Sequence, residues 1–463
     1  MTPHPFENDL SGFARDLRSG TTTSEAATRA CLERIAVLDS ALQAFQALDA
    51  ERAVQQAQAV DALLASGSDL GPLMGIPVAI KDIVAVEGFA TTNGSLYPSE
   101  ALTGPEGALV KRLKKAGCVI LGKTKTVEFA LGATGVNEAR GTPWNVWDAE
   151  THRIPGGSSS GSAVATAAGL CGFAVGTDTG GSVRIPACYN GLFGHKTSMG
   201  LWPTDGIFPL SSTLDSAGPL CRTATDAILI HEQLTGETVP PANLNGLRFG
   251  LPAPVFFDAL DSEVAAAFDA ARAKLELAGV EFVEIEIPES LERSAIFPII
   301  VGAELIASLT ADKFESARAT MDSVTAARAA VGLDVSAPDY IAATRRHRQL
   351  QKIALEKFAG IDAWVSPTCP MLPLAVNDLS KTEIADRALL SSRNTQIGNL
   401  FGLCAASLPT QQLISGSESA KPNLPSGLQL MMPAGMDNRL LSVSREIQAV
   451  IGFGPRPDMS KFI

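Results

Sequence analysis

The strongest constraint on the fold of this chain is a strand–helix–strand pattern between residues 75 and 122. A short apolar run, GIPVAI at 75–80, predicts a buried strand that ends at Lys81. Residues 108–116 are amphipathic up to Gly117, which predicts a helix, and CVILG at 118–122 predicts a second strand. This order is typical of an α/β fold, so we expect a central mixed, twisted β-sheet covered by helices.

Helical patterns dominate the rest of the chain. We expect helices in the first 70 residues, at 24–38 and 47–65, and later at 162–168, 223–234, 262–278, within 303–358 and at 438–450. The proline-rich segment 365–373 is expected to be extended. A length of 463 residues permits two or three domains, but no clear linker or repeat divides it. We therefore expect a single domain, 1–463, with N-terminal helices at 1–70, a motif-rich core at 71–240, a helical insertion or cap at 241–380 and a C-terminal part of the core at 381–463.

The acidic charge balance limits the partners of the chain. A net charge of −12 disfavours binding to nucleic acid or an anionic membrane, because both surfaces are negative. A basic group at 111–115 fits the solvated face of a helix. Seven scattered cysteines without a CxxC pair favour a reducing, cytoplasmic location and predict no metal site. Neither a signal peptide nor a membrane-spanning run is evident.

Two serine-rich segments and one lysine indicate chemistry. GGSSSGSA at 156–163 and GTDTGGSVRIPA at 176–187 offer nucleophiles, but a serine hydroxyl needs a base to take its proton. Of the five histidines, only His152 and His195 fall near these segments, and neither has an obvious aspartate partner in the sequence. Lys81 could serve instead if burial lowers its pKa. Taken alone, its segment favours a structural lysine that snorkels or pairs with Asp82 or another carboxylate.

The TDTGGS turn at 177–182 adds a second requirement of acyl transfer. Successive glycines let backbone N–H groups converge, and such groups stabilise the oxyanion of a tetrahedral intermediate. A phosphate-binding loop would need GxxxxGK[ST], which is absent, and GGSSSG is not the GxSxG of a nucleophile elbow. These segments therefore favour a serine-based acyl transfer.

The motifs together resemble the amidase signature family. The resemblance covers most of the chain, densely from about residue 70 to 225. It includes GIPVAIKD at 75–82, LGKTKTVEFALG at 121–132, TPWN at 142–145, GGSSSGSAVATAAG at 156–169, GTDTGGSVRIPA at 176–187 and TLDSAGPLCRT at 213–223, with a weaker match in SPTCPMLP at 366–373 and PSGLQLM at 425–431.

The resemblance implies a Ser–cis-Ser–Lys triad. By motif position, Ser182 is the nucleophile, Ser158 the bridging serine after a cis Gly157–Ser158 bond, and Lys81 the base. The backbone N–H groups of Thr179, Gly180, Gly181 and Ser182 are expected to form the oxyanion hole.

Other motif residues are given supporting or structural roles. Ser159 is expected to support the triad, and capping the following helix is an equal alternative for it. Asp178 and Arg184 are expected to form a structural ion pair.

The expected substrate is a small or aryl amide, and no cofactor is expected. In this family the pocket walls come from the loop after the Lys-Thr strand and from the segment after the nucleophile. Here these are Leu131, Gly132, Ala133, Thr134 and Asn137, with Ile207 and Phe208. The region 290–350 and Cys369 are further candidates for the walls. A homodimer is one oligomeric state that the sequence leaves open.

Two alternatives remain at this point. The first is the A component of a tRNA-dependent amidotransferase, a glutaminase with partner subunits; WPTDGIF at 202–208 and STLDSAGP at 212–219 depart from the segments expected there. The second is a hydrolase of the biuret/allophanate or indoleacetamide type. No separate C-terminal domain of the allophanate kind is evident, and DTGGS departs from the DTAGS form associated with that group.

Overall fold

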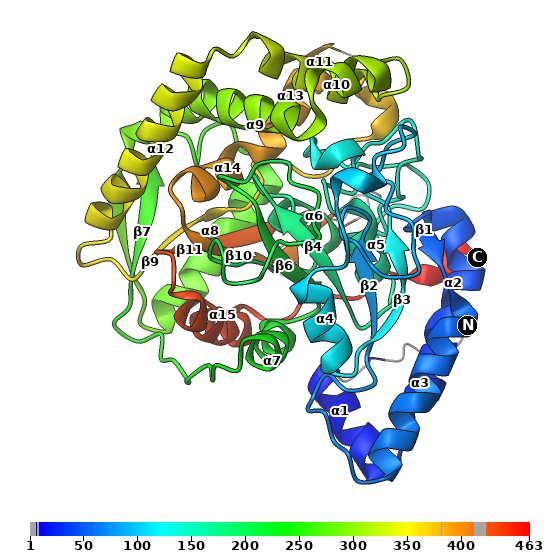
Figure 1. Cartoon of the computed structure of the whole chain (residues 1–463). Coiled ribbons are helices and arrows are strands. Elements are labelled where there is room, and N and C mark those ends of the chain that lie inside the picture. Colours follow the sequence, from blue (N-terminus) through cyan, green and yellow to red (C-terminus); the bar gives the residue numbers. More distant parts are fainter. Residues whose placement is uncertain (1–5, 7–8, 381, 412–422) are drawn as a thin grey trace.

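The computed structural model describes residues 6, 9–380, 382–411 and 423–463, with side chains left out at 382–385. Within these residues, one mixed sheet has the strand order β1-β3-β2-β4-β6-β5-β10-β11-β9-β7-β8. Strand β2 is parallel to β3 and β4, whereas β6, β5, β10 and β11 follow in antiparallel pairs. The predicted fold, a mixed sheet covered by helices, is confirmed (Figure 1). The strands are β1 (Phe45–Leu48), β2 (Pro77–Lys81), β3 (Val119–Thr124), β4 (Phe173–Asp178), β5 (Phe193–Lys196), β6 (Ser216–Cys221), β7 (Arg248–Ala253), β8 (Glu281–Glu286), β9 (Ala363–Pro367), β10 (Cys404–Pro409) and β11 (Gly427–Met432).

Helices lie on several sides of this sheet. In Figure 1, α9 to α13 gather at the top of the molecule, α7 and α15 lie below the sheet, and α1 and α3 project at the lower right. The helices are α1 (Asp9–Ser19), α2 (Ser24–Leu42), α3 (Ala50–Ala65), α4 (Ala108–Lys115), α5 (Ser160–Ala167), α6 (Arg184–Asn190), α7 (Ala224–Thr235), α8 (Ser262–Leu277), α9 (Arg293–Leu309), α10 (Ala311–Arg318), α11 (Ser323–Ala330), α12 (Ala337–Lys357), α13 (Thr382–Leu389), α14 (Arg393–Leu400) and α15 (Asp437–Ile451).

The strand–helix–strand pattern of the sequence forms as expected, with β2, α4 and β3. The helix expected at 47–65 begins later, at Ala50, because residues up to Leu48 pair with β3 as strand β1. Asp49 marks the change, since its carboxylate accepts a hydrogen bond from Arg52 N (3.0 Å) and caps α3.

The range 241–380 contains more than helices. It contributes β7, β8 and β9 to one end of the sheet in addition to α8–α12. The apolar alternation of β7 is weak, with an exposed Arg248 and a half-buried Leu251, so a strand was hard to predict from the pattern. How the chain divides into domains stays a prediction.

Close backbone packing at α5 brings the motif segments together. All eight residues of α5 are buried, and the helix packs against β2, β3 and β4. A Cβ atom on Gly161 would lie 2.2 Å from Ala44 O and 2.6 Å from Lys125 N, so only glycine fits there. The glycines of this segment therefore permit packing and do not form a linker.

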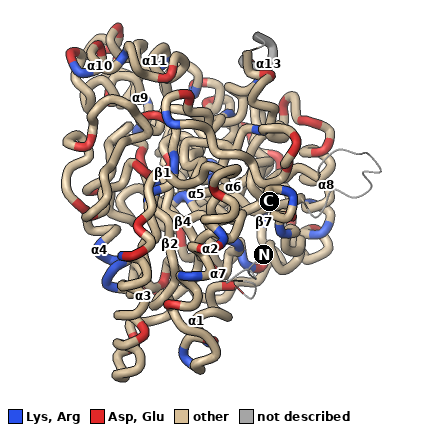
Figure 2. The backbone as a smooth tube through the Cα atoms, turned by 90° about the vertical axis from the view of Figure 1, so that its right-hand side faces the viewer, with Lys and Arg blue, Asp and Glu red and all other residues tan. Residues whose placement is uncertain are grey.

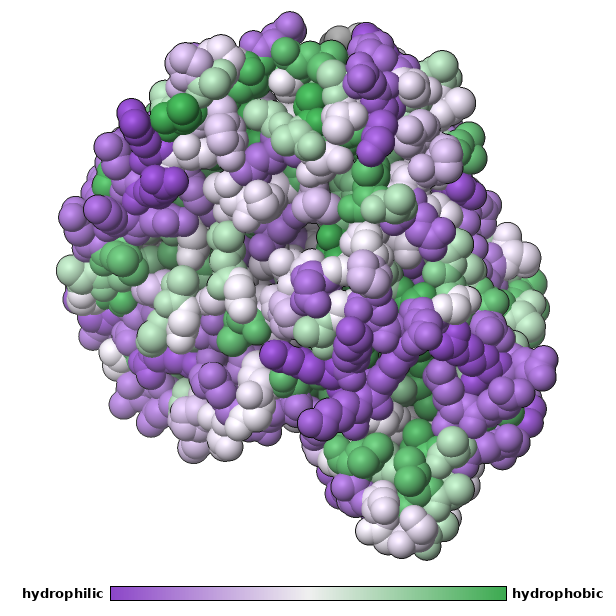
Figure 3. All heavy atoms as spheres, in the orientation of Figure 1, coloured by the Kyte–Doolittle hydropathy of each residue, from purple (hydrophilic) through white to green (hydrophobic). Residues whose placement is uncertain are grey.

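Charges are interspersed over the surface. Figure 2 shows Lys and Arg alternating with Asp and Glu, with a basic group at α4, and Figure 3 shows mostly hydrophilic residues over the visible face. No individual helix in the described ranges has the length and apolarity to cross a bilayer; one pair bent by 90°, Pro288–Leu309 with Ala311–Arg318, meets that test jointly by length and composition.

Candidate active site

Lys81 ends strand β2 inside the protein. Its side chain is fully buried, and Nζ donates hydrogen bonds to Ser158 Oγ (2.8 Å) and Thr177 Oγ1 (2.8 Å). Both partners are neutral hydroxyls, and no carboxylate in the described part of the chain lies within ion-pair distance of Nζ. Burial lowers the pKa of Lys81 to about 7, although the more distant charges of Asp215 and Asp178 oppose that change. The lysine is therefore suited to exchange a proton near neutral pH.

Asp82 does not pair with Lys81. Its carboxylate forms an ion pair with Lys123 of the neighbouring strand β3, at 2.9 Å, and both side chains are fully buried. Asp82 is the first residue after strand β2 and lies in a turn, where its carboxylate meets Lys123. Lys81 is therefore not ion-paired with Asp82, and no other carboxylate in the described chain takes that place.

Ser158 lies between β2 and the TDTGGS turn. The Gly157–Ser158 peptide bond is cis, as the family resemblance implies. The Ser158 carbonyl accepts hydrogen bonds from Thr126 Oγ1 (3.0 Å) and Val127 N (3.2 Å). These two hydrogen bonds fix the backbone of Ser158, whose hydroxyl accepts the hydrogen bond from Lys81.

Ser159 connects the two serine segments. Its backbone N–H donates to the carbonyl of Ser182 (3.3 Å), and its hydroxyl donates to Thr177 O (3.3 Å) while accepting from Thr177 N (3.3 Å). Ser159 is the N-terminal cap residue of α5 but forms no side-chain capping bond. Its hydroxyl contacts β4, as a supporting residue would.

Ser182 follows a turn that Asp178 organises. The carboxylate of Asp178 accepts hydrogen bonds from Gly181 N (2.8 Å) and Val183 N (3.2 Å). Gly181 has φ +125°, and a Cβ atom there would lie 2.1 Å from Thr395 Oγ1. The turn therefore requires glycine at this position.

Asp178 is held by Arg184, as the sequence indicated. The guanidinium contacts the carboxylate through Nε (3.0 Å) and Nη2 (2.9 Å), and both side chains are fully buried. Asn399 and Gln429 complete the hydrogen bonding of this pair. The Arg184 guanidinium holds the pKa of Asp178 well below its usual range despite burial.

Three of the four expected oxyanion donors are free in the described structure. The N–H groups of Thr179, Gly180 and Ser182 donate no hydrogen bond there, whereas Gly181 N–H is bound to Asp178. The hydroxyl of Ser182 also makes no hydrogen bond in the described chain, and no bond joins it to Ser158 Oγ. Hydrogen bonds between catalytic groups are often long or poorly aligned before substrate binds, and they tighten in the substrate complex.

A cavity of about 300 Å³ opens beside Ser182. Thr179 and Gly180 line it together with three of the expected pocket residues, Leu131, Gly132 and Ala133. Helices α9 and α11 and the segment before α14 form the opposite walls. The cavity joins the expected nucleophile to a mostly apolar binding site.

Five expected pocket residues do not line this cavity: Thr134, Asn137, Ile207, Phe208 and Cys369. Asn137 is buried, and its amide donates to the carbonyls of Gly94 and Thr126 (both 2.8 Å). Ile207 is buried and forms a β-bridge with Val84. Thr134 contributes its carbonyl to Gly156 N (3.0 Å). The loops around the site are supported by Asn137, Ile207 and Thr134, because polar groups of these residues form hydrogen bonds with the neighbouring backbone.

Asp215, in TLDSAGP, belongs to the site although sequence reasoning gave it no role. It is held by Thr179 Oγ1 (2.5 Å) and Ser211 N (2.9 Å). Burial raises its pKa to about 7, and the charge of Lys81 acts against this rise. Gln396, which lines the cavity, was also missed, and Arg293 and Arg328 were expected only as part of the region 290–350, without a role for their charges. They lie far from the motifs in sequence, so only the motif around Asp215 offered a signal.

The two histidines near the motifs are used elsewhere. His152 stacks on Trp144 with ring centroids 4.3 Å apart, and its Nε2 lies 3.3 Å from Pro143 O. His195 is buried with Nε2 3.1 Å from Asp437 Oδ1. Neither histidine forms a hydrogen bond with Ser158 or Ser182 in the described structure.

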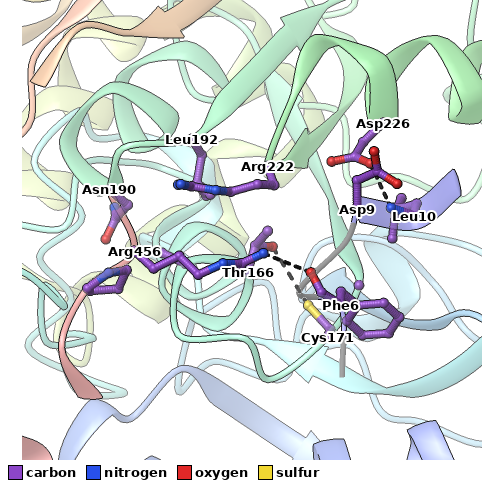
Figure 4. A pocket seen from close by; sticks show the side chains of 13 residues that line it. Phe6, Asp9, Leu10, Thr166, Cys171, Asn190, Leu192, Arg222, Asp226 and Arg456 are labelled. Carbon is purple, nitrogen blue, oxygen red and sulfur yellow. Dashed lines mark hydrogen bonds between the residues drawn. The ribbon is translucent and has the colours of Figure 1, made fainter. Parts of the chain in front are cut away.

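A second, smaller cavity lies where residues near both ends of the described chain meet the core. Figure 4 shows Asp226, Arg222 and Arg456 around it, and the backbone N–H of Leu10 donates to Asp226 (2.9 Å). Its volume is about 10 Å³, room for about one water molecule. It is a packing feature of the termini, not a substrate site.

Comparison with known proteins identifies the family. A model described as amidase matches residues 26–441. The chain belongs to the amidase family. The predicted family and the predicted enzyme class, an amidohydrolase acting on C–N bonds, are thereby confirmed.

Individual amidase-family proteins match over nearly the whole chain. A 2-amino-5-chloromuconic acid deaminase from Comamonas testosteroni is 39% identical, with 96% of each chain covered. The A component of the glutamyl-tRNA(Gln) amidotransferase from Streptomyces coelicolor is 33% identical, with 94% of each covered. A crystal structure described as an amidase has a TM-score of 0.86 and 30% identity, covering 96% of this chain and all of its own.

Proposed function

We propose that this amidase-family enzyme cleaves a carboxylic amide through a Ser182 acyl-enzyme, with Ser158 as proton relay and Lys81 as base. One observation supports this most directly. Lys81 Nζ lies 2.8 Å from Ser158 Oγ, is fully buried and has its pKa lowered to about 7. A neutral amine at that position can accept a proton, which an ion-paired lysine could not do.

The proposed reaction has two halves. Neutral Lys81 takes the proton of Ser158, which takes the proton of Ser182 as that hydroxyl attacks the amide carbonyl. The N–H groups of Thr179, Gly180 and Ser182 hold the oxyanion, each contributing about 3 kcal/mol in comparable enzymes. The protons return through the relay to the leaving amine or ammonia, and water then hydrolyses the ester by the same route.

Gly181 has a different part in this proposal. Its N–H is bound to Asp178, so we assign it to holding the turn that aims the other donors. Ser159 supports the relay through its bonds to Thr177 and Ser182. Leu131 and Gly132 form part of the substrate wall.

The test uses Ser182→Ala and an amide panel. Small aliphatic amides, aryl acetamides and anilides, biuret and glutamine are assayed for released ammonia or amine. We expect Ser182→Ala to lose turnover on every substrate of the wild type, and the wild type alone to show an ester adduct by mass spectrometry. The exposed Ser66→Ala variant is the control. An active Ser182→Ala enzyme would contradict the proposal.

A second candidate function follows from one relative. The 39% identity to a 2-amino-5-chloromuconic acid deaminase, over 96% of both chains, favours hydrolytic release of ammonia from an amino-substituted unsaturated diacid. Adding 2-aminomuconate to the panel tests it. Ammonia release from this compound, absent in Ser182→Ala, supports the deaminase; no release, with an amide turned over, supports the amidase.

The amidotransferase alternative is tested by the glutamine arm. The 33% identity to the A component of such an enzyme supports the amidotransferase alternative. Glutaminase activity that depends on added partner subunits would favour it. Biuret turnover would favour the biuret/allophanate type, and indoleacetamide among the aryl acetamides tests the remaining alternative.

We also propose a cytoplasmic enzyme of one domain, in which part of the region 241–380 caps the site. The presence of α9 and α11 in the cavity wall supports this cap.

A further inference from the structure

The cavity beside Ser182 has an unusual charge pattern. Arg293 at the start of α9 and Arg328 on α11 line it, and no Asp or Glu is among its lining residues in the described structure. The chain as a whole has a net charge of −12. Two positive charges therefore line the substrate space of an acidic protein, and no described acidic residue lines it with them.

Arg328 lacks a direct partner. Its guanidinium makes no hydrogen bond or ion pair with any residue that the structure describes, although burial lowers its pKa. Asp322 acts on it only at longer range, because the two carboxylate oxygens of Asp322 accept from Thr325 N (2.9 Å) and Glu138 N (3.4 Å). Arg328 is half-buried, and the five N–H donors of its guanidinium are open to a ligand in the cavity.

Arg293 is in a similar position. Its Nη1 donates to the neutral Gln396 Oε1 at 3.2 Å, and burial lowers its pKa as well. Two fully buried cations of this chain, Arg184 and Lys123, pair with the carboxylates of Asp178 and Asp82. The two cavity arginines have no such carboxylate partner among the described residues, and a bound anion would supply one.

We propose that the substrate carries two carboxylates, one bound by Arg328 and the other by Arg293. The two-carboxylate proposal depends on the proposed function in one respect, which is that the C–N bond to be cleaved lies at Ser182. Guanidinium and carboxylate fit each other through paired hydrogen bonds, which give orientation as well as affinity. A cavity of about 300 Å³ is at the small end of ligand sites, so the diacid is short.

A matched series of six-carbon dienes tests the proposal by calorimetry on the wild-type chain. Muconate has two carboxylates, sorbate has one, and 2,4-hexadien-1-ol has none. We expect muconate to bind at least about tenfold more tightly than sorbate, and sorbate more tightly than the alcohol, as charged hydrogen bonds predict. Equal binding of muconate and sorbate would overturn the proposal, and this comparison needs no variant.

Arg328→Met and Arg293→Met identify the groups responsible. Each is expected to weaken muconate binding about tenfold to hundredfold. The matched control is Arg318→Met, on exposed α10 beside Glu315, which should leave it unchanged. Unchanged muconate binding in either cavity variant overturns the assignment of that arginine and with it the two-carboxylate site.

Binding and catalysis are separated by Ser182→Ala. This variant should bind muconate within about threefold of wild type, since the serine hydroxyl is not a ligand of either carboxylate. Tight, arginine-dependent binding with an active Ser182→Ala enzyme would refute the proposed mechanism and support the diacid site. An inactive Ser182→Ala enzyme with no preference for muconate would do the reverse.

Discussion

Replacing Lys81 by methionine tests the central electrostatic claim in both activity and stability. The pKa of Lys81 falls from its ordinary 10.5 to about 7 because the folded protein buries it. Only the neutral amine can act as base, so kcat/KM should rise with pH. Between pH 6 and pH 8 the neutral fraction grows about tenfold, and activity should grow with it.

The same pKa has a consequence for folding. Between pH 7 and about 10.5 the unfolded chain holds a proton on Lys81 that the folded chain has lost, so stability rises with pH in that window. From pH 7 to pH 9 this contributes about 2 kcal/mol to the free energy of unfolding. Lys81→Met lacks this contribution, while its lost hydrogen bonds to Ser158 and Thr177 cost the same at both pH values. Removing the cation also raises the pKa of Asp215 further, which increases the difference in the same direction.

The assay is urea unfolding of wild type and Lys81→Met at pH 7 and pH 9, together with the pH profile of the wild type. The wild type should gain about 2 kcal/mol relative to the variant over this interval, and the variant should be inactive throughout. If the difference in unfolding free energy is the same at both pH values, and wild-type activity is flat down to pH 6, Lys81 is not a lysine of lowered pKa and the proposed relay is refuted.

Three further predictions address the surroundings of the relay. Asp215→Asn removes a charge that raises the pKa of the base lysine, so the acidic limb of the pH–rate profile should move to lower pH; an unmoved limb would contradict this. Gly181→Ala, at φ +125° with no room for a Cβ, should reduce kcat by more than about hundredfold, whereas Gly200→Ala, at φ +76° in open space, should leave kcat unchanged. Arg184→Met leaves Asp178 buried without its partner and should lower the free energy of unfolding by about 3–5 kcal/mol in urea titrations; a loss below about 1 kcal/mol would show that the pair is not needed.

Local sequence patterns predicted much of the fold. The β2–α4–β3 unit, α2 and the C-terminal helix are where apolar periodicity places them. The strands β6 and β10 were missed because SAGPLC and CAASLP are short and rich in small residues, with no alternation. Their strand conformation comes from pairing with β4, β5 and β11.

The candidate site also has residues that local sequence patterns indicated and residues that only tertiary contacts placed. The resemblance to the amidase signature family indicated Lys81, Ser158 and Ser182, and it rests on motifs that are local features of the sequence. Asn137 and Ile207 do not line the cavity beside Ser182, because Asn137 bonds the carbonyl of Gly94 and Ile207 pairs with Val84; such long-range contacts cannot be read from the sequence of a loop.

By itself, the sequence determined the family, the order of the chemical groups and the turns that present them, because each depends on a few neighbouring residues. The tertiary structure decided that Asp82 meets Lys123 and leaves Lys81 with only hydroxyl partners. It also brought Arg293 and Arg328 to the cavity of Ser182 from more than a hundred residues away along the chain. Burial and charge pairing set both the basicity of the lysine and the charge of the pocket, and they depend on contacts that no local pattern encodes.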